Sequence, residues 1–251
     1  MSSIVLMRAF ENIPGRYDLG MRLITLGLID FVHKKIAESV PQGWDVLDIG
    51  CGTGKLSVLL ANRGATVTAI DKCPRMAEMT SARASSEGLS KSVSVHQKTA
   101  MEADTSFENA QFEAVILSLV ISELTIDERN WVLRQCERIL KPCGILLLAD
   151  EFCPESFIKR MAFLVLRFPF HLAAYLYTQI KSMMTSNIWW KLYYALVELP
   201  LMLISFLVGA PMTVPLEQIE KSLPTGLRVA EAVAFGVGGS IRLLKIEKIQ
   251  G

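Results

Sequence analysis

The chain has 251 residues, of which 51% are hydrophobic, so it is long enough for one elaborated domain with a sizeable core. Its 26 Lys and Arg residues nearly balance its 25 Asp and Glu residues, and a net charge of +1 excludes the strong field that would favour nucleic acid. The five cysteines form no C-x-x-C pair and no cluster with zinc spacing, so we expect no metal, no disulfide and a reduced, cytoplasmic setting.

The first 43 residues are predicted to be helical. Residues 1–10 lack the basic start and the cleavage site of a secretory signal, so we expect the amino terminus to stay in the cytoplasm. From Tyr17 to Val40, apolar residues recur every three or four positions, which is the spacing of one helical face. We therefore assign residues 1–43 to N-terminal helices.

Residues 44–156 alternate between predicted strands and helices. The first strand, Trp44–Ile49, is followed by a glycine loop and the helix Leu56–Ala61. Later segments are predicted in the same order: strands at Thr66–Ile70, Ser92–Gln97, Phe112–Leu119 and Ile145–Ala149, helices at Pro74–Glu87 and Asp127–Leu140, and a turn at Lys141–Gly144. This alternation indicates a parallel sheet covered by helices on both faces.

Residues 157–215 contain two long apolar runs, Met161–Ile180 and Trp189–Ala210, each interrupted by charged residues and a proline. Neither run resembles a clean membrane-spanning helix, because charges at a bilayer centre are costly and rare. We expect an apolar helical hairpin, inserted between the fifth and sixth strands. It could lie in the membrane interface or dip into one leaflet, which we favour, or it could be a lid or an oligomer interface.

Residues 216–251 are predicted to close the sheet. The runs Leu227–Phe235 and Ser240–Lys248 flank a glycine-rich turn and predict a pair of strands. Such a pair could add an antiparallel edge, which brings the number of predicted strands to seven.

The glycine loop carries the clearest chemical signal. Gly50, Gly52 and Gly54 follow a strand and open a helix, so the backbone can approach a nucleotide-like ligand closely. Asp71 ends the next strand at close to the roughly 20-residue spacing at which a carboxylate binds both ribose hydroxyls. Lys55 is not part of a G-x-x-x-x-G-K-[ST] motif, which argues against a nucleoside triphosphate.

These residues resemble the class I S-adenosylmethionine-dependent methyltransferases, and more narrowly the ubiquinone/menaquinone C-methyltransferase family. The similarity covers most of the chain and includes Tyr17-Asp18, Leu26-Gly27-Leu28, the glycine loop, Asp71 with Met76, Phe112–Val115, Arg138–Gly144 and Glu151-Phe152. The resemblance implies an α/β fold with a Rossmann-like, seven-stranded, mostly parallel sheet.

The resemblance also implies S-adenosylmethionine as cofactor. The glycine loop would surround its methionine part, Asp71 would bind the ribose, Met76 would pack on the adenine, and Ser118 would lie beside the sulfonium. The full set of implied cofactor residues is Asp48, Gly50, Cys51, Gly52, Gly54, Asp71, Lys72, Met76, Thr99, Ala100 and Ser118. Thr99 stands where the family usually has an acidic residue.

The catalytic candidates are few, because a sulfonium methyl group is already activated and the protein needs only to align a nucleophile and exclude water. If the acceptor is phenol-like, Tyr17, Glu123 and His171 are the candidate bases. Each also has a purely structural interpretation: Tyr17 could pack, Glu123 could cap the following helix, and His171 could belong to the polar seam of the hairpin. We expect His33 and His96 to face solvent or to lie in a strand rather than to bind a ligand.

Three functional hypotheses follow. The leading one is a methyltransferase for a lipophilic acceptor, such as a quinone, an isoprenoid or another lipid, associated with the inner face of the membrane. A second hypothesis keeps the enzyme class but has a soluble metabolite or a protein as acceptor, with the hairpin as a docking surface. A third is a noncatalytic cofactor-binding module at a membrane, for which Thr99 is modest support.

Overall fold

The computed structural model of the chain describes residues 14–152, 216–236 and 241–249, together with the single positions 165, 169 and 172. Apart from those three positions, the predicted hairpin at 157–215 lies outside the described residues, and so do residues 1–13. The hairpin and its membrane role therefore stay predictions, and so does the division of the chain into the segments 1–43, 44–156, 157–215 and 216–251. Among the described residues, no helix combines the length and the apolar character needed to cross a bilayer.

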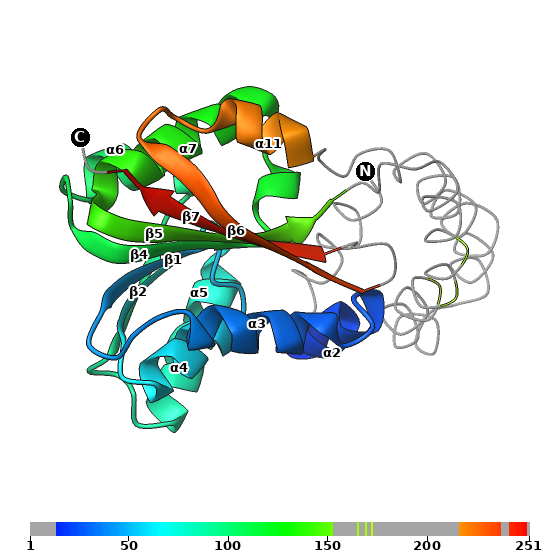
Figure 1. Cartoon of the computed structure of the whole chain (residues 1–251). Coiled ribbons are helices and arrows are strands. Elements are labelled where there is room, and N and C mark those ends of the chain that lie inside the picture. Colours follow the sequence, from blue (N-terminus) through cyan, green and yellow to red (C-terminus); the bar gives the residue numbers. More distant parts are fainter. Residues whose placement is uncertain are drawn as a thin grey trace.

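A seven-stranded sheet forms the centre of the described part of the chain (Figure 1). Its strands are β1 (Asp45–Ile49), β2 (Thr66–Asp71), β3 (Val93–Gln97), β4 (Phe112–Ser118), β5 (Leu140–Glu151), β6 (Leu227–Phe235) and β7 (Ile241–Lys248). Their spatial order is β3-β2-β1-β4-β5-β7-β6. All pairs from β3 to β5 are parallel, while β7 runs antiparallel to both β5 and β6. The predicted Rossmann-like, mostly parallel sheet is confirmed.

Helices cover both faces of this sheet (Figure 1). One face carries α2 (Pro14–Ile24), α3 (Leu28–Glu38), α4 (Lys55–Asn62) and α5 (Pro74–Ser86). The other carries α6 (Ala103–Ser106), α7 (Ile126–Ile139) and α11 (Leu216–Ser222). Because alternate residues of a strand face opposite ways, each buried strand supplies side chains to two apolar cores. Val46 packs beneath the first group of helices and Leu47 beneath the second.

The helical pattern between Tyr17 and Val40 forms the two helices α2 and α3, which are separated because Leu26 and Gly27 both adopt left-handed backbone conformations, with φ of 56° and 76°. One local feature differs from the sequence predictions. The predicted turn at Lys141–Gly144 is wrong, since β5 already begins at Leu140. An irregularity in the pairing of β4 with β5 absorbs these residues within the strand.

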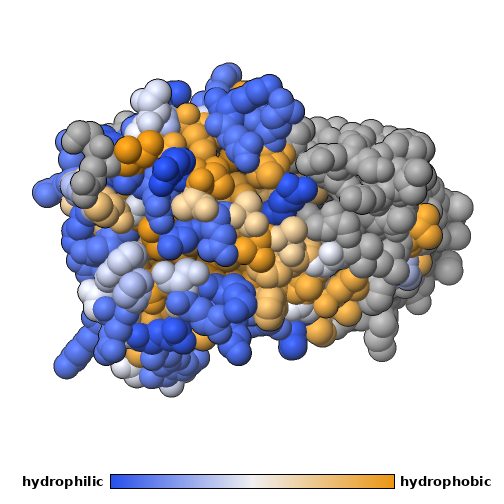
Figure 2. All heavy atoms as spheres, in the orientation of Figure 1, coloured by the Kyte–Doolittle hydropathy of each residue, from blue (hydrophilic) through white to orange (hydrophobic). Residues whose placement is uncertain are grey.

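The outer surface of α2 and α3 carries exposed apolar side chains. Leu19, Leu26 and Phe31 are 44%, 39% and 46% exposed. Figure 2 shows apolar atoms gathered over this side of the molecule. The ring of Phe31 also packs edge-on against Phe235 at the end of β6, with 5.4 Å between ring centroids, so α3 is fastened to the far edge of the sheet.

Candidate active site

The site forms where the order of the strands reverses. β1 lies between β2 and β4, and the chain leaves β1 toward one side and reaches β4 on the other. In open α/β sheets, ligands bind outside the carboxyl ends of the strands at this switch point. The glycine loop after β1, Asp71 at the end of β2 and Ser118 at the end of β4 all lie at this edge.

The glycine loop is held tightly by its neighbours. The amide groups of Gly50 and Cys51 both donate to the carbonyl oxygen of Ile70, at 2.8 and 3.0 Å. Gly54, with φ of 78°, has no room for a side chain, because a Cβ atom would lie 2.8 Å from the Cα of Thr80. This close packing of α4 against α5 explains why the loop needs glycine at this position.

Asp71 connects β2 to the glycine loop. Its Oδ2 accepts a hydrogen bond from the amide of Gly52 at 2.9 Å, and its Oδ1 accepts one from the amide of Cys73 at 2.8 Å. The two parts of the predicted cofactor site are therefore in direct contact. Both also line the same cavity, as a shared ligand requires.

A cavity of about 280 Å³ brings together most of the predicted cofactor residues. We call it the large cavity. The predicted residues that line it are Gly50, Gly52, Asp71, Lys72, Met76, Thr99, Ala100 and Ser118, and the catalytic candidates Tyr17 and Glu123 also line it. Its walls thus combine bare backbone, a carboxylate and apolar side chains, which suits an adenosyl group.

A second cavity of about 60 Å³ adjoins the large one. We call it the small cavity. The two share five lining residues: Tyr17, Gly50, Gly52, Ser118 and Leu119. The predicted residues Asp48 and Cys51 line only the small cavity, whereas Gly54 lines neither and acts through its packing on Thr80.

Asp48 and Cys51 are buried beneath the loop. Burial raises the pKa of Asp48 to about 6, although its Oδ2 accepts a hydrogen bond from Ser57 Oγ at 2.6 Å. Burial likewise raises the pKa of the Cys51 thiol, whose sulfur lies 3.5 Å from Thr80 Oγ1. A thiol that stays protonated is a poor nucleophile, so the geometry gives Cys51 a packing role.

In the structure, Glu123 and Thr99 each contact a charged side chain. Glu123 does not cap α7, because Thr125 occupies that position and accepts from the amide of Glu128 at 3.3 Å. Instead, Glu123 Oε2 lies 3.0 Å from Lys72 Nζ, in an ion pair beside the large cavity. Thr99 donates from its amide and its hydroxyl to Glu102, at 2.7 and 2.9 Å, and so caps the short helix Ala100–Glu102.

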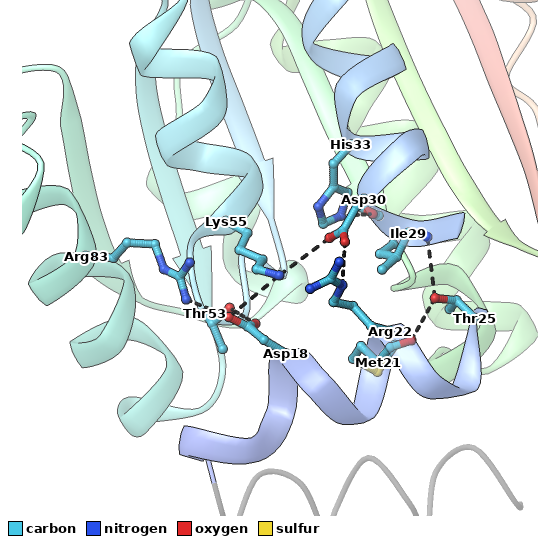
Figure 3. A network of polar contacts seen from close by, with 11 residues as sticks. Asp18, Met21, Arg22, Thr25, Ile29, Asp30, His33, Thr53, Lys55 and Arg83 are labelled. Carbon is cyan, nitrogen blue, oxygen red and sulfur yellow. Dashed lines mark hydrogen bonds and ion pairs between the residues drawn. The ribbon is translucent and has the colours of Figure 1, made fainter. Parts of the chain in front are cut away.

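The wall formed by α2 is fastened by a network of charges that the sequence patterns did not indicate (Figure 3). Asp18 accepts from Thr53 Oγ1 at 2.6 Å and pairs with Arg83 Nη2 at 2.7 Å. Lys55 lies 3.9 Å from Asp18 and 3.5 Å from Asp30. One residue of α2 therefore joins the glycine loop to α5, directly beside Tyr17, which lines both cavities.

His33 is a site residue that the sequence reasoning missed. Its partly buried ring lines the small cavity, and Nε2 lies 3.3 Å from Ser118 Oγ, so the expectation that it would face solvent is wrong. Burial lowers the pKa of His33 to about 4. Its position four residues after the buried Ile29, on the inner face of α3, was the available signal. His96 is an exposed residue of β3, as expected, and His171 lies outside the described residues.

Comparisons with known proteins agree with this geometry. Residues 46–144 match the family model described as "Methyltransferase domain". An uncharacterized methyltransferase of Synechocystis sp. is 31% identical over 152 residues, which cover 58% of this chain and 66% of the relative. A ubiquinone biosynthesis O-methyltransferase of Methylocella silvestris is 39% identical over 108 residues, covering 43% of this chain and 40% of the relative.

A solved structure supports the fold. The [4+2]-cyclase SpnF superimposes with a TM-score of 0.59 at 17% identity, covering 89% of this chain and 80% of that one. At such identity the likeness concerns the fold alone. The chain spans less than two thirds of the length of either curated relative, 66% and 40%. Residues 46–144 of the chain are therefore a methyltransferase domain.

Proposed function

We propose that this protein transfers a methyl group from S-adenosylmethionine to a hydroxyl group of a lipophilic, quinol-like acceptor. The observation that carries the proposal is that the two cavities lie side by side and share five lining residues. The large cavity offers the surfaces an adenosyl group needs, and it adjoins a smaller pocket through Ser118 at the end of β4. A methyl donor and a methyl acceptor need two adjoining compartments of this kind.

The residues present fit the cofactor of the family. Bare backbone at Gly50 and Gly52 permits close approach of the methionine part, and the Asp71 carboxylate suits the ribose hydroxyls. Met76 is a buried, polarizable wall residue suited to an adenine ring. When bound, S-adenosylmethionine supplies a methyl group that is already activated on sulfur.

The protein's own contribution is alignment and exclusion of water. Tyr17 of α2 lines both cavities, and Asp18 and Met21 line the small one, on a helix held in place by the contacts of Asp18. Lys72 and Glu123 form an ion pair beside the large cavity. This contact favours a structural role for Glu123 at the rim of the cavity over a role as catalytic base. Tyr17 therefore stays a candidate for contact with the acceptor.

Two observations support a lipophilic acceptor. The relative from Methylocella silvestris is named for ubiquinone biosynthesis and as an O-methyltransferase, which points to a hydroxyl on a quinone precursor. The sequence of residues 157–215 is strongly apolar and carries Trp189 and Trp190, which suit the headgroup level of a membrane. We therefore propose that the protein works in the cytoplasm at the inner face of a membrane.

The test uses the full chain and isotopically labelled cofactor. Binding of S-adenosylmethionine is first measured by calorimetry, and the protein is then incubated with methyl-labelled cofactor and a prenylated catechol, or with lipid extracts. We expect the label to move into the organic phase as an alkali-stable methyl ether. Cofactor binding without transfer to any of these acceptors would contradict the proposal, and transfer into water-soluble products alone would contradict the lipophilic acceptor.

A further inference from the structure

We propose that His33 is a catalytic residue that holds the acceptor's hydroxyl group in the small cavity and takes its proton during methyl transfer. The proposal rests on the proposed function and adds to it the group that receives the proton of the acceptor's hydroxyl. It is carried by the position of the imidazole, which reaches from α3 to the end of β4.

The small cavity has the shape of an acceptor subsite with one polar end. Met21, Ile29, Leu56 and Leu119 give it apolar walls, while the ring of His33 provides a polar atom. His33 Nε2 lies 3.3 Å from the hydroxyl oxygen of Ser118, which lines both cavities. A hydroxyl group on an otherwise apolar ring suits this pocket, because it can join the hydrogen bond between the two side chains.

Other titratable groups of the small cavity are engaged in contacts that serve the fold. The Asp48 carboxylate is buried and bonded to Ser57, and the Cys51 sulfur lies beside Thr80. Lys55 and Asp18 belong to the charge network that fastens α2. The imidazole of His33, in contrast, contacts a neutral hydroxyl group that a substrate hydroxyl can replace or extend.

The charges around His33 suit a proton acceptor next to a sulfonium. Three charged groups act on the ring: Asp30 on α3 and Asp18 on α2 favour its protonated form, and Lys55 on α4 opposes it. Asp48 on β1 lines the same cavity. Burial keeps the ring neutral at pH 7, so it adds no positive charge beside the positively charged cofactor. Asp30 and Asp18 favour the protonated ring, and they would stabilise it once it gains a proton.

The proposed step is balanced in atoms and charge. A lone pair of the hydroxyl oxygen forms the new bond to the methyl carbon, and the bond between that carbon and sulfur breaks, with its electron pair remaining on sulfur. The hydroxyl proton moves to Nε2 of His33. The products are a methyl ether, a neutral thioether and an imidazolium, so the positive charge passes from sulfur to the ring.

The test compares His33→Gln with the matched control His96→Gln. Glutamine keeps a hydrogen-bonding group near the position of Nε2 but cannot accept a proton. With the prenylated catechol as acceptor, we expect His33→Gln to lower kcat by about 100-fold or more, the scale of general base catalysis. We expect it to change the affinity for S-adenosylmethionine and the KM of the catechol by no more than about threefold, and we expect His96→Gln to behave like the parent.

A second readout does not depend on turnover. The chain has three histidines, so the two variants identify the ring nitrogen signals of His33 and His96 in nitrogen-15 spectra. We expect the Nε2 signal of His33 to shift when the catechol joins the complex with S-adenosylhomocysteine, while that of His96 stays in place. An active parent together with a His33→Gln variant of equal kcat, or an unchanged His33 signal, would overturn this proposal alone; a parent inactive on every hydroxyl acceptor would overturn the proposed function with it.

Discussion

The carboxylate of Asp71 has two roles, one in the shape of the glycine loop and one in the predicted binding of the ribose. It already accepts hydrogen bonds from the amides of Gly52 and Cys73, so it shapes the glycine loop as well as facing the large cavity. Because Asp71 lines the large cavity, a bound ribose would share its carboxylate oxygens with these amides. The residue therefore couples the shape of the loop to the presence of the ligand.

Replacing Asp71 should weaken cofactor binding. Asp71→Ala removes charged hydrogen bonds worth about 1.5–3 kcal/mol, so calorimetry should show a loss of affinity of about 10- to 150-fold. Asp71→Asn keeps an acceptor oxygen for Gly52 and should lose less. The exposed Asp45, at the opposite end of β1, gives a control variant, Asp45→Ala, with parental affinity. An Asp71→Ala protein that binds as tightly as the parent would show that the carboxylate does not touch the cofactor.

Asp48 should make the stability of the protein depend on pH. Its pKa is raised from 3.8 to about 6 in the fold, so folding favours the protonated carboxyl by about 3 kcal/mol. That contribution is present below pH 3.8 and is lost as the pH rises through about 6. Asp48→Asn removes the titration, so its free energy of unfolding relative to the parent should rise by about 2–3 kcal/mol between pH 4 and pH 7.5.

Urea denaturation at the two pH values measures this difference. Asp150, a further buried carboxyl whose pKa is raised, is present in both proteins, so its effect cancels in the comparison. Asp45→Asn, which alters an exposed carboxylate, should show no such change between the two pH values. A constant difference between Asp48→Asn and the parent would mean that folding does not raise the pKa of Asp48.

At the residue scale, the sequence predicted the site residues that lie close to one another along the chain. The glycine loop and Asp71 follow a short local pattern of strand, loop, helix and strand, and both line the large cavity. His33 was missed because its role depends on a contact with Ser118, which lies 85 residues away. A helical periodicity shows which face of α3 is buried, but it does not show which strand end lies beneath that face.

At the scale of elements, α2 is attached to the site by both apolar packing and charges. Met21 is buried and Leu19 is 44% exposed, while Asp18 reaches the glycine loop at Thr53 and α5 at Arg83. Hydrogen bonds and ion pairs of this kind fix the position of an element more than they add to stability. The position of Tyr17 over the cavities therefore depends on Asp18.

Asp18→Asn should loosen this wall without unfolding the protein. Asparagine can still accept from Thr53, but the ion pair with Arg83 is lost, and for a partly exposed pair that costs about 1 kcal/mol. We expect cofactor affinity to fall by about fivefold, and cleavage by trypsin after Arg22 to become faster. Glu217→Gln, which breaks the exposed pair with Lys221 on α11, should change neither quantity.

Mass spectrometry of the fragments locates the trypsin cleavage sites. The same experiment at 0.5 M salt should bring the parent closer to the variant, because salt screens exposed charges. Equal cleavage of parent and variant within α2 at low salt would show that apolar contacts, rather than Asp18, hold this helix.

Elements with strong periodicity were predicted to within a few residues, and those that depend on backbone detail were not. β2, α5 and β6 match their expected ranges closely. The lengthened β5 was missed because Pro142 and Gly144 are typical of turns, while the pairing that carries the strand through them comes from β4.

At the scale of the whole molecule, the topology brings distant segments to one edge. The alternation of strands and helices predicted a parallel sheet with helices on both faces, and the family resemblance predicted its Rossmann-like form, whereas the structure supplies the order of the strands. How α2 and α3 close over that edge could not be predicted, since it depends on contacts with Phe235, Thr53 and Arg83 from three separate segments. This packing of α2 and α3 over the strand ends forms part of the walls of the cavities.

The apolar segment at residues 157–215 should determine where the whole protein resides. We expect the full chain to sediment with vesicles of phosphatidylcholine and phosphatidylglycerol, because its aromatic residues suit the interface. Replacing Trp189 and Trp190 together by serine should lower the bound fraction several-fold. Cofactor affinity measured by calorimetry should stay parental, since the predicted cofactor residues lie between Asp48 and Ser118. A parent chain that stays in the supernatant with these vesicles would favour a lid or an interface between copies of the chain.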